Sequence, residues 1–160
     1  MNASRSELAA WRSPEAWRMH PADVAEFAER GWHCETRRCR MPAAIVTQRS
    51  YRHHGRDRDI EHFACETHGT AFAQRHRIEI DPASEREARR LSEPEMAALA
   101  AGGRHCDGPA CRNPATCIFL ERYMRQGQRE VLERLACDRH VAMFSQRLHV
   151  EPGPSPEEDR

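Results

Sequence analysis

Apolar positions recur at helical spacing in two short stretches, residues 24–28 and residues 96–100. A glycine follows each stretch, as is typical of the end of a helix. The second stretch is also preceded by Ser92-x-x-Glu95, the pattern of an N-terminal capping box. The pattern therefore predicts one short helix in each half of the chain.

Each predicted helix is followed by two runs of strand-forming residues around a turn that contains glycine. The four runs are residues 43–51, 59–65, 115–123 and 130–137, and the turns are His54-Gly55 and Gln126-Gly127. After each pair of runs, a histidine and a phenylalanine four residues later lie as on one face of a helix. We therefore expect a β-hairpin and then a second helix in each half.

The two halves also share residues position by position. When residues 31–79 are aligned with residues 103–151 without a gap, 17 of the 49 positions are identical. About four identities are expected from ordinary composition. This self-similarity at a spacing of 72 residues indicates an internal duplication.

Cysteine and histidine recur within the repeat as C-x4-C, 25 intervening residues, then C-x2-H. The C-x4-C pair closes a tight loop whose sulfurs can face one ion, and the i, i+3 spacing places the second pair on one face of a helix's first turn. Three thiolates and an imidazole suit a closed, structural zinc site. The predicted ligands of two Zn²⁺ ions per chain are Cys34, Cys39, Cys65 and His68, then Cys106, Cys111, Cys137 and His140.

A cysteine loop, a hairpin and a helix that carries two ligands together resemble the treble-clef zinc finger, although the loop is longer than the commoner C-x2-C. The resemblance implies an α+β fold of two tandem treble-clef-like zinc modules. The expected segments are an N-terminal helical, Trp-containing segment (1–19), the first zinc module (20–80), a polar connector with helical character (81–91), the second zinc module (92–151) and a disordered tail (152–160).

Alternatives remain for some of these side chains. A Cys3His set can also hold an iron–sulfur cluster, although the loop and the helix-borne pair favour zinc. His33 and His105 directly precede the ligand sets, so either could compete as a ligand or form a hydrogen bond near the loop. Cys117 has Ile45 as its counterpart, which favours a small buried apolar residue over a redox or additional ligand role.

Composition limits which partners and which cellular location are expected for the chain. The 160-residue chain has a formal net charge of zero, so it has no global attraction to nucleic acid or membranes. All 25 basic residues are arginine, which reflects either coding bias or recognition of carboxylate or phosphate groups. No apolar run reaches the roughly 18 residues of a membrane span, and no signal segment is visible. We expect a cytoplasmic protein without disulfides or a small-molecule substrate.

Arginine alternates with tyrosine near both predicted hairpin turns, a combination suited to phosphate contact and base stacking. The predicted partner-binding residues are Arg49, Tyr51, Arg52 and Arg56, then Arg122, Tyr123, Arg125 and Arg129. The local charge excess is small: residues 31–79 hold nine arginines against six acidic residues, and residues 103–151 hold eight against six. The predicted function is non-enzymatic binding of nucleic acid, with a solvated charged loop as the alternative for these residues.

Two other function classes stay open. A protein-interaction adaptor could use Trp11, Trp17 and Trp32 as anchors, although these side chains could instead cover the first module. An enzyme related to treble-clef nucleases would need a catalytic histidine and an open metal position. His62 and the His53-His54 pair do not recur in the second half, so the enzyme hypothesis is the less favoured one.

Overall fold

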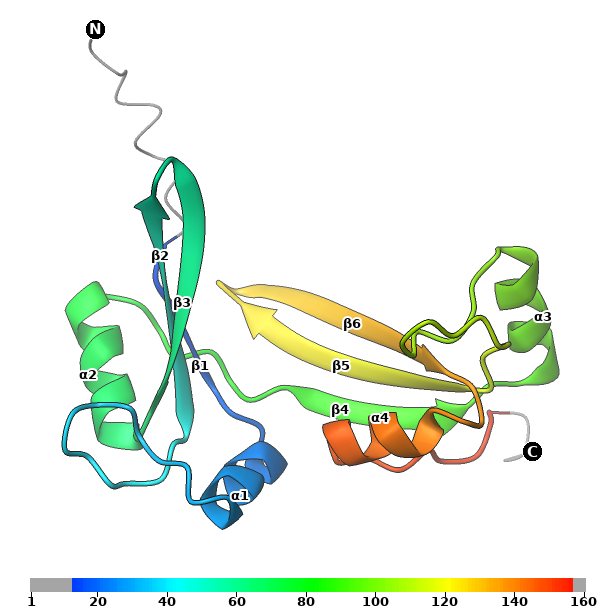
Figure 1. Cartoon of the computed structure of the whole chain (residues 1–160), viewed down its shortest axis with the longest axis horizontal. Coiled ribbons are helices and arrows are strands. Elements are labelled where there is room, and N and C mark those ends of the chain that lie inside the picture. Colours follow the sequence, from blue (N-terminus) through cyan, green and yellow to red (C-terminus); the bar gives the residue numbers. More distant parts are fainter. Residues whose placement is uncertain (1–12, 157–160) are drawn as a thin grey trace, which may run out of the picture. The chain divides into compact units, whose positions relative to one another are not determined.

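The computed structural model describes residues 13–156, which form two compact units (Figure 1). The first unit extends to Ala83 and includes residues 124–128, and the second begins at Ser84. The elements are β1 (Glu15–Arg18), α1 (Pro21–Glu29), β2 (Ile45–His53), β3 (Arg56–Ala64), α2 (Glu66–His76), β4 (Glu85–Arg90), α3 (Glu93–Ala101), β5 (Cys117–Arg125), β6 (Gln128–Ala136) and α4 (Val141–Leu148). Both units are small α+β structures.

Each unit contains one three-stranded sheet, in the order β1-β2-β3 or β4-β5-β6. The outer strands β1 and β4 pair antiparallel with β2 and β5. The second unit repeats the positions of the first at a spacing of 72 residues, since β2 and β5 begin at Ile45 and Cys117, and β3 and β6 at Arg56 and Gln128. The strands of each unit therefore occupy corresponding positions along the chain.

Both hairpin turns lie where the sequence predicts them. His54 and Gly55 have φ angles of 50° and 73°, and Gln126 and Gly127 have φ angles of 48° and 76°. Positive φ at both central residues is the signature of a type I′ turn, whose twist matches that of the flanking strands. The glycine supplies the second of these conformations without steric cost.

The predicted capping box at the start of α3 is confirmed. The Ser92 hydroxyl accepts from the Glu95 N–H at 3.4 Å, and the Glu95 carboxylate accepts from the Ser92 N–H at 2.9 Å. Arg89 also donates to Glu95, and this bond, with the Ser92 N–H, lowers the pKa of Glu95 to about 2. Across residues 13–156, no helix combines the length and apolar character needed to cross a bilayer.

Two segments predicted to have helical character are strands instead. Residues 15–18 form β1, and the predicted connector 81–91 contains β4. β4 is mostly polar, so its sequence lacks an apolar signal, and β1 has only four residues, too few to show a clear alternating pattern. In both segments, pairing with a neighbouring strand decides the conformation. Residues 1–12, including Trp11, lie outside the described residues.

The predicted disordered tail is ordered at its beginning. The Gly153 N–H donates to the Ala88 carbonyl at 2.9 Å, and the Gly153 carbonyl accepts from the Arg90 N–H at 2.9 Å. These bonds satisfy backbone groups on the open edge of β4, which offsets the cost of ordering a polar, proline-rich segment. Residues 157–160 lie outside the described residues.

Helices cover both faces of the first sheet near the start of β2 and the end of β3. On one face α2 lies alongside the β2–β3 hairpin (Figure 1), and Gly69 leaves room for the Ile45 side chain. On the other face Phe27 of α1 packs with Val46 and Phe63. The second unit has two corresponding clusters, of which one contains Cys117, Phe119, Ala136, Phe144 and Leu148, and the other contains Leu91, Ala115, Ile118 and Leu135.

Candidate metal centres and the first hairpin

The first metal-ligand cluster gathers side chains from three segments. Cys34 and Cys39 lie in the loop before β2, Cys65 is the N-cap of α2, and His68 lies in its first turn. The Cys39 and Cys65 sulfurs are 3.9 Å apart, and His68 Nδ1 is 3.5 Å from the Cys34 sulfur and 3.2 Å from the Cys65 sulfur. All four donor atoms lie within 4.8 Å of one another.

The second cluster has nearly the same geometry. The Cys111 and Cys137 sulfurs are 3.8 Å apart, and His140 Nδ1 is 3.4 Å from the sulfurs of both Cys106 and Cys137. One detail differs from the prediction: His140 is the N-cap of α4 and does not lie in its first turn. A tight turn still holds it in place, because its N–H donates to the Cys137 carbonyl at 2.9 Å.

These separations fit one ion at each centre. A tetrahedral ion with metal–sulfur bonds of about 2.3 Å and metal–nitrogen bonds of about 2.05 Å places two sulfurs about 3.8 Å apart, and a sulfur and a nitrogen about 3.6 Å apart. In the structure these two sulfur–sulfur distances are 3.9 and 3.8 Å, and the sulfur–nitrogen distances given above range from 3.2 to 3.5 Å. Each cluster could therefore hold a metal ion.

All seven cysteines are free, and one thiol in each cluster is already biased toward the thiolate that binds metal. Burial raises the pKa of the Cys34 thiol, but hydrogen bonds from Thr36 and from backbone N–H groups outweigh burial and lower this pKa to about 6. For Cys137, burial is likewise outweighed by hydrogen bonds with Arg139 and His140, and its pKa is also lowered to about 6. Fewer protons must then leave when a metal binds.

Two N–H groups donate hydrogen bonds to sulfurs of the second cluster. The Gly108 N–H donates to the Cys106 sulfur at 3.3 Å, and the Asn113 amide donates toward the Cys137 sulfur at 3.8 Å. Gly108 also lies directly against the imidazole of His140, since a Cβ at this position would lie 2.5 Å from Nδ1. The loop thus approaches the histidine ligand as closely as a glycine allows.

Gly108→Ala is expected to weaken metal binding at the second centre by about tenfold or more, because the added methyl displaces the His140 ring from its position. Competition with a chromophoric chelator on the full chain measures the affinity of each centre. Gly102→Ala is the matched control, since its Cβ would be no closer than 3.5 Å to any atom. Equal affinities for the two variants would show that this close approach does not position the ligand.

The remaining cysteine and histidine candidates lie outside both clusters. Cys117 is 1% exposed within the core of the second unit, and burial raises the pKa of its thiol. This placement agrees with a small buried apolar role. His33 Nδ1 contacts the Gly31 carbonyl at 3.3 Å, and His105 Nδ1 contacts the Cys106 carbonyl at 3.0 Å.

The predicted partner residues of the first hairpin divide between its two faces, because side chains alternate along a strand and directly paired residues share a face. On the face toward α2, Arg49 is followed along β2 by Tyr51 and His53, and the strand partners of Tyr51 and His53 are Arg58 and Arg56. No carboxylate among the described residues pairs with Arg49, Arg56 or Arg58. We call Arg49, Tyr51, His53, Arg56 and Arg58 the cationic face.

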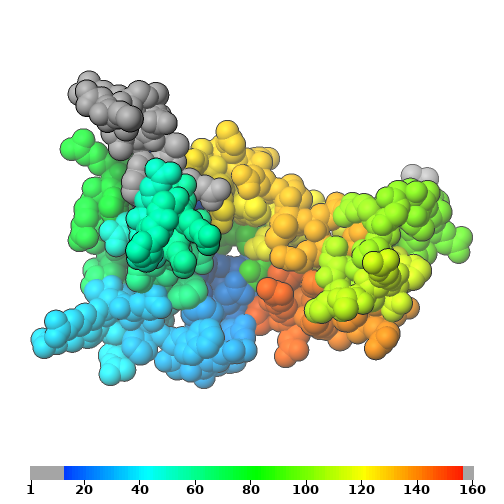
Figure 2. All heavy atoms as spheres, turned by 45° about the horizontal axis from the view of Figure 1, so that its top comes forward, coloured from blue at the N-terminus to red at the C-terminus, as the bar shows by residue number. Residues whose placement is uncertain are grey.

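The opposite face of the same hairpin carries the acidic residues. Arg52 lies there and pairs with Asp57 at 3.6 Å, and Ser50 donates to Asp59 at 2.6 Å. Glu61 belongs to the same face by its register with Gln48. Figure 2 shows the side chains around the β2–β3 turn, drawn in teal, at the molecular surface. A hairpin with nearly balanced charge therefore has one basic face and one acidic face.

The second hairpin has a different distribution of charge. Arg122 forms an ion pair with Glu87 at 2.8 Å. Glu121 occupies the position that corresponds to Arg49, and it pairs with Arg86 at 3.2 Å. Tyr123 and Arg125 are partly buried, whereas Arg129 is exposed. The two predicted sets of partner residues are therefore not equivalent in structure.

Arg58 belongs to the cationic face although it is not among the predicted binding residues. The signal that identifies it is strand alternation, which places it opposite Tyr51. Of the tryptophans, Trp17 packs against the core on the α1 side, and Trp32 is 51% exposed beside Phe27, with ring centroids 4.7 Å apart.

No protein-family model, curated protein or solved structure matches this chain. The two metal-ligand clusters and the charge distribution of the first hairpin are therefore the grounds on which a function is inferred.

Proposed function

We propose that the chain is a non-enzymatic, zinc-stabilised binding module that contacts nucleic acid through the cationic face of its first hairpin. The segregation of charge on this hairpin carries the proposal. Arg49, Arg56 and Arg58 share a face that holds no acidic residue, while Asp57 and Asp59 lie on the other. A chain without net charge thus presents a locally basic surface, which is what phosphate binding requires.

Zinc is the ion that best suits both centres. Three sulfurs and one nitrogen at tetrahedral separations are the ligands of structural zinc sites. The order of loop, hairpin and helix supports a treble-clef-like module, and the 72-residue spacing of the strands is what an internal duplication would produce. Units of this size bury small cores, and a structural zinc ion can contribute about 10–16 kcal/mol to folding.

A structural role for the ions supports a non-enzymatic function. A catalytic zinc ion keeps one coordination position for water or substrate. Each cluster instead offers four protein ligands, which complete a tetrahedron: Cys34, Cys39, Cys65 and His68, or their four counterparts in the second unit.

The cationic face has the groups needed to bind a nucleic-acid strand. Its three arginines are exposed and can each contact a phosphate, and Tyr51, with 38% exposure, offers a ring for stacking. Binding of this kind releases counterions, so its affinity falls as salt rises, with a slope that reports the number of phosphates contacted.

Arg56→Ala with Arg58→Ala is expected to weaken binding and to reduce the slope of log affinity against log salt by between one and two, because two phosphate contacts are lost. Fluorescence anisotropy with labelled single-stranded and duplex oligonucleotides, repeated across a salt series, measures both quantities. The metal content of each variant reports whether the unit remains folded.

Arg52→Ala with Arg122→Ala is the matched control. It removes the same charge, but both arginines already pair with a carboxylate, Asp57 or Glu87. We expect affinity and slope to stay close to those of the original chain. If the two double variants lost affinity equally, the binding site would not lie on the cationic face. If the original chain showed no salt-dependent binding, nucleic acid would be rejected as the partner.

A protein-interaction adaptor is the second candidate, and one feature favours it. Phe27, Trp32 and Phe63 line a hollow of about 420 Å³ beside the Cys34 loop. An exposed tryptophan over an aromatic hollow is typical of anchor sites in protein interfaces. If the oligonucleotide titrations show no binding, this surface becomes the leading candidate for the functional site.

A further inference from the structure

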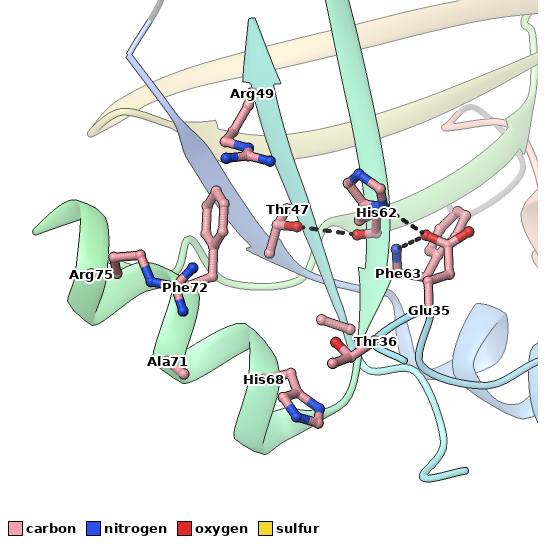
Figure 3. Close-up of a pocket in the computed structure, with 11 residues that line it drawn as sticks. Glu35, Thr36, Thr47, Arg49, His62, Phe63, His68, Ala71, Phe72 and Arg75 are labelled. Carbon is pink, nitrogen blue, oxygen red and sulfur yellow. Dashed lines mark hydrogen bonds and ion pairs between the residues drawn. The ribbon is translucent and has the colours of Figure 1, made fainter. Parts of the chain in front are cut away.

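A cavity of about 330 Å³ opens between the β2–β3 hairpin and α2 of the first unit. Thr47, Arg49 and His62 line it from the hairpin, and His68, Phe72 and Arg75 line it from α2 (Figure 3). Its volume lies at the lower end of the roughly 300–1,000 Å³ range of small-molecule sites. It therefore has room for one small planar group.

The lining of this cavity differs between the two units at several aligned positions, among them residue 47 of β2. In the second unit Phe119 is 1% exposed and packs on Phe144 of α4, with ring centroids 5.7 Å apart. The residue at the corresponding position of β2 is Thr47, so Phe72, which corresponds to Phe144, has no aromatic partner on the hairpin. Phe72 projects from α2 toward β2, and part of the space that a phenylalanine would fill is open (Figure 3).

The rim of this cavity is cationic. Arg49 extends from β2 above Phe72, and Arg75 lies on α2 beside the same ring (Figure 3). Among the described residues, no acidic side chain pairs with either arginine. The second unit instead has Glu121 at the position of Arg49, paired with Arg86. At this strand position the first unit therefore has an arginine with no carboxylate partner among the described residues, whereas the second unit has a paired glutamate.

The far wall of the cavity supplies polar groups that could meet the edge of a base. The Glu35 carboxylate accepts from the Phe63 N–H at 2.8 Å and lies 3.4 Å from His62 Nδ1. The Thr47 hydroxyl donates to the His62 carbonyl at 3.4 Å. An aromatic ring, two cations and these polar groups together suit a planar base attached to a phosphate backbone.

We propose that the cavity receives one unpaired nucleobase of a single strand, which stacks on Phe72 while the adjacent phosphates contact Arg49 and Arg75. This inference rests on the proposed function, since Arg49 belongs both to the cavity and to the cationic face that would guide the strand. A base held in a duplex must be unstacked and unpaired before it can enter such a pocket. The first unit therefore selects single strands.

Thr47→Phe tests the cavity by introducing the residue that the second unit carries at this position. Anisotropy titrations compare a single-stranded oligonucleotide that contains one 2-aminopurine with its duplex. We expect the original chain to bind the single strand at least tenfold more tightly, and the 2-aminopurine fluorescence to fall as the base stacks. Thr47→Phe should lose most of this preference while it keeps its metal content and its salt dependence.

Phe72→Leu provides a second test that does not depend on whether the larger side chain of Thr47→Phe destabilises the first unit. It keeps an apolar side chain but removes the stacking ring, so the fluorescence change should disappear. An unchanged single-strand preference in both variants, with salt-dependent binding intact, would overturn the cavity proposal and leave the proposed function standing. No binding of either oligonucleotide by the original chain would overturn both.

Discussion

Cys65→Ser is expected to reduce the metal content from two ions to one per chain and to unfold the first unit alone. Cys65 supplies a buried sulfur from the N-cap of α2, 3.9 Å from the Cys39 sulfur, so its loss opens the tetrahedron. Because a structural zinc ion contributes about 10–16 kcal/mol, a unit this small is not expected to stay folded without it. Elemental mass spectrometry gives the metal content. Tryptophan fluorescence reports the first unit, since all three tryptophans lie within residues 11–32.

Two further cysteine variants control this experiment. Cys137→Ser should also lose one ion, but without the change in tryptophan emission, because its cluster belongs to the second unit. Cys117→Ser removes a cysteine that is equally buried but is not part of either cluster, so it should retain two ions. Two ions in Cys65→Ser, or one in Cys117→Ser, would show that the ligand set is wrong.

Gly69→Val is expected to destabilise the first unit by about 1–3 kcal/mol through overpacking. A Cβ on Gly69 would lie 2.6 Å from Cδ1 and 2.8 Å from Cβ of Ile45, a stiff β-branched side chain with little freedom to move. The better helix propensity of valine offsets only a few tenths of a kcal/mol. Urea unfolding of the metal-loaded chain, followed by tryptophan fluorescence, measures the change in free energy.

Ile45→Cys is expected to rescue Gly69→Val. The second unit carries the reverse pair at the corresponding positions, with the small Cys117 on β5 and the larger Val141 at the start of α4. Val141 packs against the cluster that contains Cys117, so a small strand residue accommodates a larger helix residue there. The double variant should be more stable than the sum of the two single changes predicts. Strict additivity would mean that the two positions do not share one packing site.

Local spacing was enough to predict much of each unit. The eight cysteine and histidine positions define two ligand sets because a short loop and one helical turn constrain the distance between paired side chains. The structure gathers these residues into two clusters. The two-residue turns and the Ser92–Glu95 capping box were predictable for the same reason, since each depends only on residues within four positions of one another.

Pairing between distant segments was not predictable in the same way. The sequence of β4, Glu85–Arg90, is polar enough to suggest a helical connector, and only its register with β5 makes it a strand. The tail is similar, since Gly153 is ordered by the backbone of Ala88 and Arg90. In both cases the hydrogen bonds that stabilise the segment come from residues far away in the chain.

At the candidate metal centres and binding surfaces, the sequence determined some features and the tertiary structure determined others. The sequence by itself determined the chemistry of this protein: three sulfurs and a nitrogen per centre, and arginine with tyrosine near each turn. The tertiary structure alone decided which of these arginines share a face, because strand register placed Arg58 beside Tyr51 and turned Arg52 toward Asp57. It also decided that a threonine facing Phe72 leaves a cavity, since an open volume depends on the side chains brought together from two separate elements.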